Sequence, residues 1–161
     1  MESRAKLFGH PLHQMLIVFP LGLLATALAF DAIQLVTGNG FWSVLAYWMI
    51  AAGIVMGLLA APFGLIDWLA IPGGTRAKRV GALHGGGNVV VLFLYLASWL
   101  MRTSDPSAPE APALVLAFVG GGLAMVTGWL GGELVDRLAI GVDDGAHVDA
   151  PSSLSTRRAR D

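Results

Sequence analysis

Long stretches without a charged side chain dominate this sequence. Residues 80–101 contain no Asp, Glu, Lys or Arg, and neither do residues 111–132. A helix of about 20 residues, with a rise of 1.5 Å per residue, crosses a hydrocarbon core about 30 Å thick. Both stretches have this length, so they predict helices that span a membrane.

The overall composition agrees with a membrane protein and excludes several soluble classes. Hydrophobic residues make up 55% of the 161 residues and charged residues only 13%, with a net charge of -1. A soluble domain has about 25% charged residues. No excess of basic residues is available to attract nucleic-acid phosphates. Cysteine is absent, which excludes disulfides, thiolate metal sites and thiol catalysis.

The first half of the chain contains further apolar stretches. One ends near Asp31, and the next, residues 32–66, is too long for a single span. The turn-forming residues 37–40 (Thr-Gly-Asn-Gly) mark the break. We therefore predict an all-α integral membrane protein, a four-transmembrane-helix up-down bundle with short loops. The helices are expected at about residues 14–36, 42–69, 81–101 and 112–133.

Three segments follow from this arrangement: an N-terminal segment (1–13), a transmembrane domain (14–138) and a C-terminal tail (139–161). The tail is rich in Asp, Ser and Arg, so it is predicted to be flexible. Nine of the ten basic residues lie in the N-terminal segment, in the loop between the second and third helices, or after the fourth helix. Because basic residues favour the cytoplasmic side, we expect a bacterial inner-membrane protein with both termini in the cytoplasm.

Small residues recur at four-residue spacing on the predicted helices. Close backbone approach at such faces supplies packing energy that lipid does not provide. The same faces could instead join copies of the chain into a homo-oligomer, and spacing alone does not separate the two. The residues are Gly53, Gly57 and Ala61, then Gly81 and Gly85, then Gly120, Ala124, Gly128 and Gly132.

Polar side chains gather at one end of the predicted bundle, although they lie far apart in the sequence. Polar groups are costly in a bilayer, so each is a candidate for a functional site. They are His10, His13, Asp67, His84, Asn88, Glu133 and Asp136. By contrast, Asp31 and Gln34 lie at the other end and are predicted to cap the first helix at the interface.

Histidines on facing helices of a bundle can bind haem b through two neutral imidazoles. We expect His13 and His84 to form this pair. Around them, small residues would clear space for the flat macrocycle, and polar groups would orient the imidazoles. The surrounding residues are His10 as a substitute or supporting group, Gly85 and Gly86 as the small residues, and Asn88, Asp67 and Glu133 as the polar groups.

Two alternatives to haem stay open. A non-haem transition metal needs three or four ligands. Its candidate ligands are His10, His13, His84, Glu133 and Asp67. Alternatively, no cofactor is bound, and these residues lie in the headgroup zone, hydrogen-bonded to helix ends and to each other.

Several short motifs resemble those of one family. They include His10-Pro11-Leu12-His13, Asp67-Trp68, His84 with Asn88, and the run from Gly128 to Val135. Through these motifs nearly the whole chain resembles the bacterial transmembrane family catalogued as "domain of unknown function 2231". Two positions depart from the family pattern: Gln14 replaces a usual Pro, and Leu138 replaces a frequent His. The family has no established activity, but some relatives are joined to iron–sulfur or cytochrome domains, so the resemblance implies a redox setting.

The leading functional hypothesis is an electron-transfer module that binds haem or metal and works with a redox-protein partner, rather than an enzyme. The few serines have no neighbouring histidine, so no catalytic triad is indicated. One alternative is a proton- or cation-coupled transporter or channel-like oligomer, with Asp67, His84 and Glu133 along its path. Another is a structural subunit that joins a larger membrane complex through its glycine faces.

Overall fold

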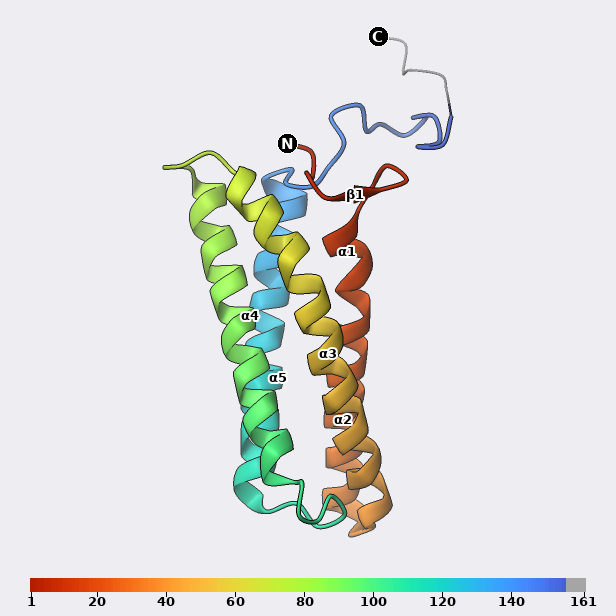
Figure 1. Ribbon diagram of the computed structural model, residues 1–161, viewed down its shortest axis with the longest axis vertical. Coiled ribbons are helices and arrows are strands. Elements are labelled where there is room, and N and C mark those ends of the chain that lie inside the picture. Colours follow the sequence, from red (N-terminus) through yellow and green to blue (C-terminus); the bar gives the residue numbers. More distant parts are fainter. Residues whose placement is uncertain (156–161) are drawn as a thin grey trace.

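The computed structural model describes residues 1–155, and four long helices dominate it (Figure 1). These helices are long and apolar enough to cross a membrane, and they run alternately up and down. The predicted all-α, four-span architecture is therefore confirmed. The elements in chain order are β1 (Lys6–Leu7), β2 (His10–Pro11), α1 (Leu12–Leu16), α2 (Val18–Thr37), α3 (Gly40–Ala70), α4 (Arg76–Met101), α5 (Ala111–Gly132) and the π-helix η1 (Glu133–Arg137).

Capping residues set the helix boundaries. The turn after α2 begins with a glycine in the left-handed conformation, and the Asn39 side chain then accepts a hydrogen bond from the backbone N–H of Phe41 at 3.0 Å. Thr75 likewise accepts from the backbone N–H of Lys78 at 3.1 Å. This cap starts α4 at Arg76, ahead of the predicted residue 81, because a capped helix can begin outside the apolar stretch.

The four spans form two helical hairpins. α2 packs chiefly on α3, and α4 chiefly on α5, so the first hairpin comprises residues 12–70 and the second residues 76–137. One end of the bundle, which we call the termini end, holds residues 1–11 and η1; the opposite loop end holds residues 37–40 and 102–110. A buried apolar core joins the hairpins. Its members are Leu24, Ala27, Ala46, Ile50, Ile54, Val91, Tyr95 and Ala117.

The glycines of the helices differ in whether another element lies against them. A Cβ at Gly57 would be only 2.8 Å from Leu92, so Gly57 permits close approach of α3 and α4, as predicted. Other glycines are exposed, with no atom within 4 Å of an added Cβ. They are Gly22, Gly85, Gly86, Gly122, Gly128 and Gly132. The prediction that three of them (Gly85, Gly128 and Gly132) lie on packed faces within the bundle is wrong, because the helices are rotated so that they point outwards.

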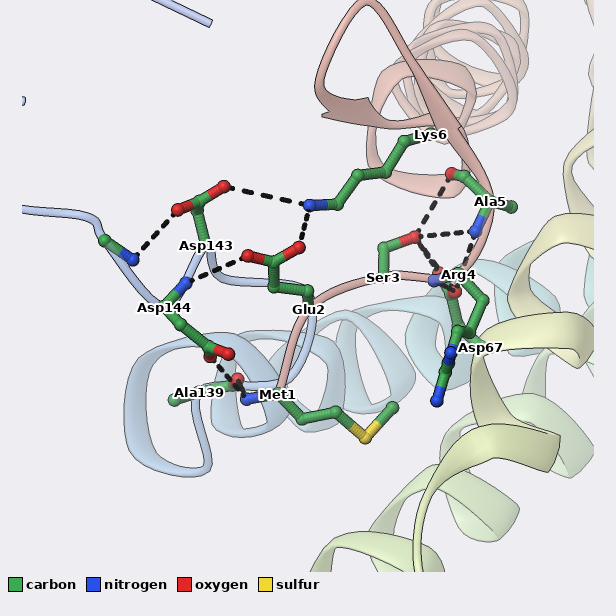
Figure 2. Close-up of polar contacts among 11 residues, drawn as sticks. Met1, Glu2, Ser3, Arg4, Ala5, Lys6, Asp67, Ala139, Asp143 and Asp144 are labelled. Atoms are coloured by element: carbon green, nitrogen blue, oxygen red, sulfur yellow. Dashed lines mark hydrogen bonds and ion pairs between the residues drawn. The ribbon is translucent and has the colours of Figure 1, made fainter. Parts of the chain in front are cut away.

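The N-terminal segment and the start of the tail pack together at the termini end (Figure 2). Lys6 forms ion pairs with Glu2 and Asp143, and its hydrogen bond lowers the pKa of Glu2 below the ordinary value. The amine of Met1 donates to the carbonyl of Ala139 at 3.0 Å. The first residues of the tail therefore contact the N-terminal segment. Flexibility of the rest of the tail stays a prediction, and residues 156–161, with three of the basic residues used for orientation, lie outside the described residues.

Candidate functional site

Two histidines from different hairpins face each other in the half of the bundle nearer the termini end. The ring centres of His13 in α1 and His84 in α4 are 6.3 Å apart, and the ring planes are nearly perpendicular at 89°. Both side chains are partly buried. The fold thus brings together the pair of imidazoles that the sequence proposes as ligands, across 71 residues of chain.

A backbone carbonyl in the second helix of the same hairpin holds each imidazole. His13 Nδ1 lies 3.1 Å from the carbonyl oxygen of Ala60, and His84 Nδ1 lies 2.8 Å from that of Thr127. A carbonyl oxygen can only accept a hydrogen bond, so Nδ1 is the protonated nitrogen in both rings. In the neutral imidazole, Nε2 then keeps its lone pair, which is the arrangement found in metal-binding histidines.

A glycine one helical turn beyond each carbonyl gives the imidazole room to reach it. Gly64 follows Ala60 by four residues, and Gly131 follows Thr127 by four. A Cβ would lie 2.8 Å from the imidazole at Gly64 and 3.0 Å from it at Gly131. Favourable carbon contacts lie at about 3.5–4.0 Å, so any side chain here would push the ring away. The two hairpins therefore hold their histidines by the same device.

Asn88 connects the second of these histidines to α5. Its side-chain Nδ2 donates to the backbone carbonyl of His84 at 2.9 Å and lies 3.3 Å from His84 Nε2. Its Oδ1 accepts a hydrogen bond from the Thr127 hydroxyl at 3.0 Å. Asn88 thus restricts the orientation of the His84 ring, which agrees with the supporting role that the sequence proposes for it.

The other residues of the expected metal site have different partners. His10 is exposed in β2. Asp67 accepts a hydrogen bond from the Ser3 hydroxyl at 2.7 Å (Figure 2), and Glu133 pairs with Arg76 at 2.8 Å. Within residues 1–155, no group of three or more His, Cys, Asp or Glu is placed to hold a metal ion. The five-residue non-haem metal site is therefore not assembled, because the N-terminal segment binds Asp67 and Arg76, the first residue of α4, binds Glu133.

These local partners also bear on the alternative transport path. Asp67 and Glu133 are engaged with the N-terminal segment and with Arg76, rather than with His84. Gly85 and Gly86 lie on an exposed face of α4. A Cβ added at either glycine would meet no atom within 4 Å.

Sequence reasoning missed a completely buried ion pair. Arg102, at the end of α4, donates two hydrogen bonds to the Asp31 carboxylate in α2, both at 2.7 Å. Both side chains are 0% exposed. The predicted interfacial cap at Asp31 is therefore wrong: the carboxylate points into the bundle because a guanidinium from the other hairpin meets it there. One sequence signal was available. Asp31 and Arg102 each border a charge-free stretch, and both lie at the same end of the predicted bundle.

Several buried polar atoms without a hydrogen-bond partner belong to Arg102 itself or to residues near the ion pair. Within residues 1–155, four buried side-chain atoms have no hydrogen-bond partner. They are Gln34 Oε1, Ser43 Oγ, Trp99 Nε1 and Arg102 Nε. Gln34 follows Asp31 by one turn, and Trp99 precedes Arg102 by one turn. The ion pair therefore lies in a part of the bundle that contains several buried polar groups. The charges of Asp31 and Arg102 neutralise each other.

Comparison with known proteins identifies the chain at the level of a family. No curated protein and no solved structure matches it. A family model described as "Predicted membrane protein (DUF2231)" matches residues 9–144, a range that includes all four spans and both facing histidines. The chain therefore belongs to this family of predicted membrane proteins.

Proposed function

We propose that the protein binds haem b between His13 and His84 and transfers electrons within the membrane. The observation that supports this is the facing pair of imidazoles, each with Nδ1 bonded to a carbonyl, which leaves Nε2 as the nitrogen that would ligate. At His84 the Asn88 amide, 3.3 Å from Nε2, would have to turn aside. Non-haem iron or zinc would need three or four protein ligands, and this site offers two. A porphyrin supplies four nitrogens of its own, so a two-histidine site suits it.

The separation of the two rings suits ligands of a single group. The ring centres of His13 and His84 lie 6.3 Å apart, so both imidazoles would hold one haem. Gly64 and Gly131 leave room for the imidazoles themselves.

The surrounding residues would orient the ligands rather than react. Bound haem would supply a one-electron redox couple, and His13 and His84 would hold it. The carbonyls of Ala60 and Thr127 keep both Nδ1 atoms protonated, which raises the ligand strength of the imidazoles. A redox-protein partner would have to exchange electrons with this site.

Absorption spectroscopy of single variants tests the proposal. Protein purified from its own host's membranes should show a Soret band, and His13→Ala or His84→Ala should abolish it while the assembled bundle remains. His10→Ala is the matched control: it removes a histidine from the exposed β2, and the band should persist. A wild-type protein without haem, or a band that survives both ligand substitutions, would contradict haem binding at this site.

We further propose that the termini end faces the cytoplasm of a bacterial inner membrane. The basic residues at this end support it, since among residues 1–155 only Arg102 lies at the loop end, and it is neutralised by Asp31. A reporter active only in the periplasm should be active when inserted near Ser107 and silent when fused after Asp161. The reverse pattern would overturn this orientation.

A further inference from the structure

A small pocket lies at the end of α5, where the helix widens into η1. Its volume is about 250 Å³, and it is lined by Trp129, Gly132, Glu133, Asp136 and Arg137. Pockets for drug-sized ligands have volumes of about 300–1,000 Å³, so this one suits a smaller group. π-Helical turns are rare and frequently accompany functional sites.

The pocket contains one unpaired charge of each sign. Glu133 is neutralised by Arg76 at 2.8 Å. The side chains of Asp136 and Arg137 are exposed, and neither has a hydrogen-bond or ion-pair partner in the part of the chain that the structure describes. The pocket therefore offers a free carboxylate and a free guanidinium while its total charge, with Arg76, is zero.

The pocket lies where a lipid headgroup would be. Trp129 is 67% exposed and precedes Asp136 and Arg137 by about two turns. Its ring therefore lies on the outer surface of the bundle near the end of the span. Tryptophan is enriched at this depth, at the boundary of hydrocarbon and headgroups. The ligand would thus reach the pocket from the bilayer.

We propose that this pocket binds the headgroup of a zwitterionic aminophospholipid, of the phosphatidylethanolamine class. The ammonium would donate to Asp136 and lie against the Trp129 ring, while the phosphate would accept from Arg137. A quaternary choline ammonium has no N–H to donate to Asp136. An anionic lipid without an ammonium would place its phosphate next to the Asp136 carboxylate. The repulsion between these two negative charges would weaken binding. This proposal does not depend on haem binding.

Native mass spectrometry of the protein in nanodiscs tests the lipid class. The discs would contain phosphatidylglycerol mixed with an equal amount of either phosphatidylethanolamine or phosphatidylcholine. Wild-type protein should retain phosphatidylethanolamine about tenfold more than phosphatidylcholine, the difference expected from one charge-assisted hydrogen bond. Asp136→Asn should remove this preference, and Arg137→Gln should lower retention of both lipids.

Two exposed residues provide matched controls, Asp149→Asn and Arg4→Gln, which should leave the preference unchanged. Equal retention of the two lipids by the wild type, or an unchanged preference in Asp136→Asn, would overturn the proposal. Soluble glycerophosphoethanolamine carries the same headgroup without acyl chains. If it displaced the bound lipid at micromolar concentration, the ligand would be a free zwitterion and the assignment to a membrane lipid would fail.

Discussion

Replacing Arg102 by Met should destabilise the bundle by about 3–5 kcal/mol, because it leaves the Asp31 carboxylate buried without its partner. Asp31 and Arg102 are both completely buried and joined by two hydrogen bonds. The double variant Asp31→Leu with Arg102→Met should recover most of this loss, since a buried ion pair costs about as much desolvation as its attraction returns. The measurement is the free energy of unfolding in detergent for the wild type and both variants.

The exposed Arg4 provides the control for loss of a positive charge. Arg4→Met should change the free energy of unfolding by less than about 0.5 kcal/mol, as surface substitutions usually do. A double variant as unstable as Arg102→Met alone would mean that the ion pair itself, rather than the avoided lone charge, stabilises the bundle. A single variant as stable as the wild type would contradict the buried position of the pair.

Gly131→Leu should destabilise the protein by about 1–3 kcal/mol relative to Gly132→Leu, because overpacking forces neighbouring groups to move. A Cβ at Gly131 would lie 3.0 Å from the His84 ring, whereas one at Gly132 meets no atom within 4 Å. Both variants gain the same helix propensity from losing a glycine, so their difference isolates the contact with the imidazole. Thermal unfolding in detergent measures it.

The two glycine variants should also differ in haem content if His84 is a ligand. Gly131→Leu would push the His84 ring away from the carbonyl of Thr127 and lower the Soret absorbance, whereas Gly132→Leu would not. Equal stability of the two variants would show that the imidazole does not lie against Gly131. Equal loss of stability would mean that Gly132 also faces a packed surface.

These two predictions concern how the two hairpins are joined, at opposite ends of the bundle. The ion pair of Asp31 and Arg102 joins the first hairpin to the second at the loop end. His13 and His84 face each other across the same boundary nearer the termini end, 6.3 Å apart. The buried core lies along the helices between them. An ion pair thus joins the hairpins at the loop end, and the proposed haem would join them nearer the termini end.

The number, length and class of the helices could be predicted from the sequence, because they depend on local composition. A charge-free stretch of about 20 residues is long enough to span a membrane as a helix. The helix satisfies the backbone hydrogen bonds, and the apolar side chains can face lipid. The turn at 37–40 is likewise a local property of Gly and Asn. The end at which His13 and His84 gather follows from up-down connectivity alone, which is why the facing pair could be anticipated.

Which face of each helix points inwards could not be predicted in this way. In a membrane, both the lipid-facing and the packed faces are apolar, so hydrophobic periodicity does not report helix rotation. Gly128 and Gly131 have similar sequence surroundings, yet one faces outwards and the other lies against His84. Asp31 was assigned to the interface and Asp67 to a metal for the same reason. Their partners, Arg102 and the N-terminal segment, are known only once the rotation and packing of all four helices place them side by side.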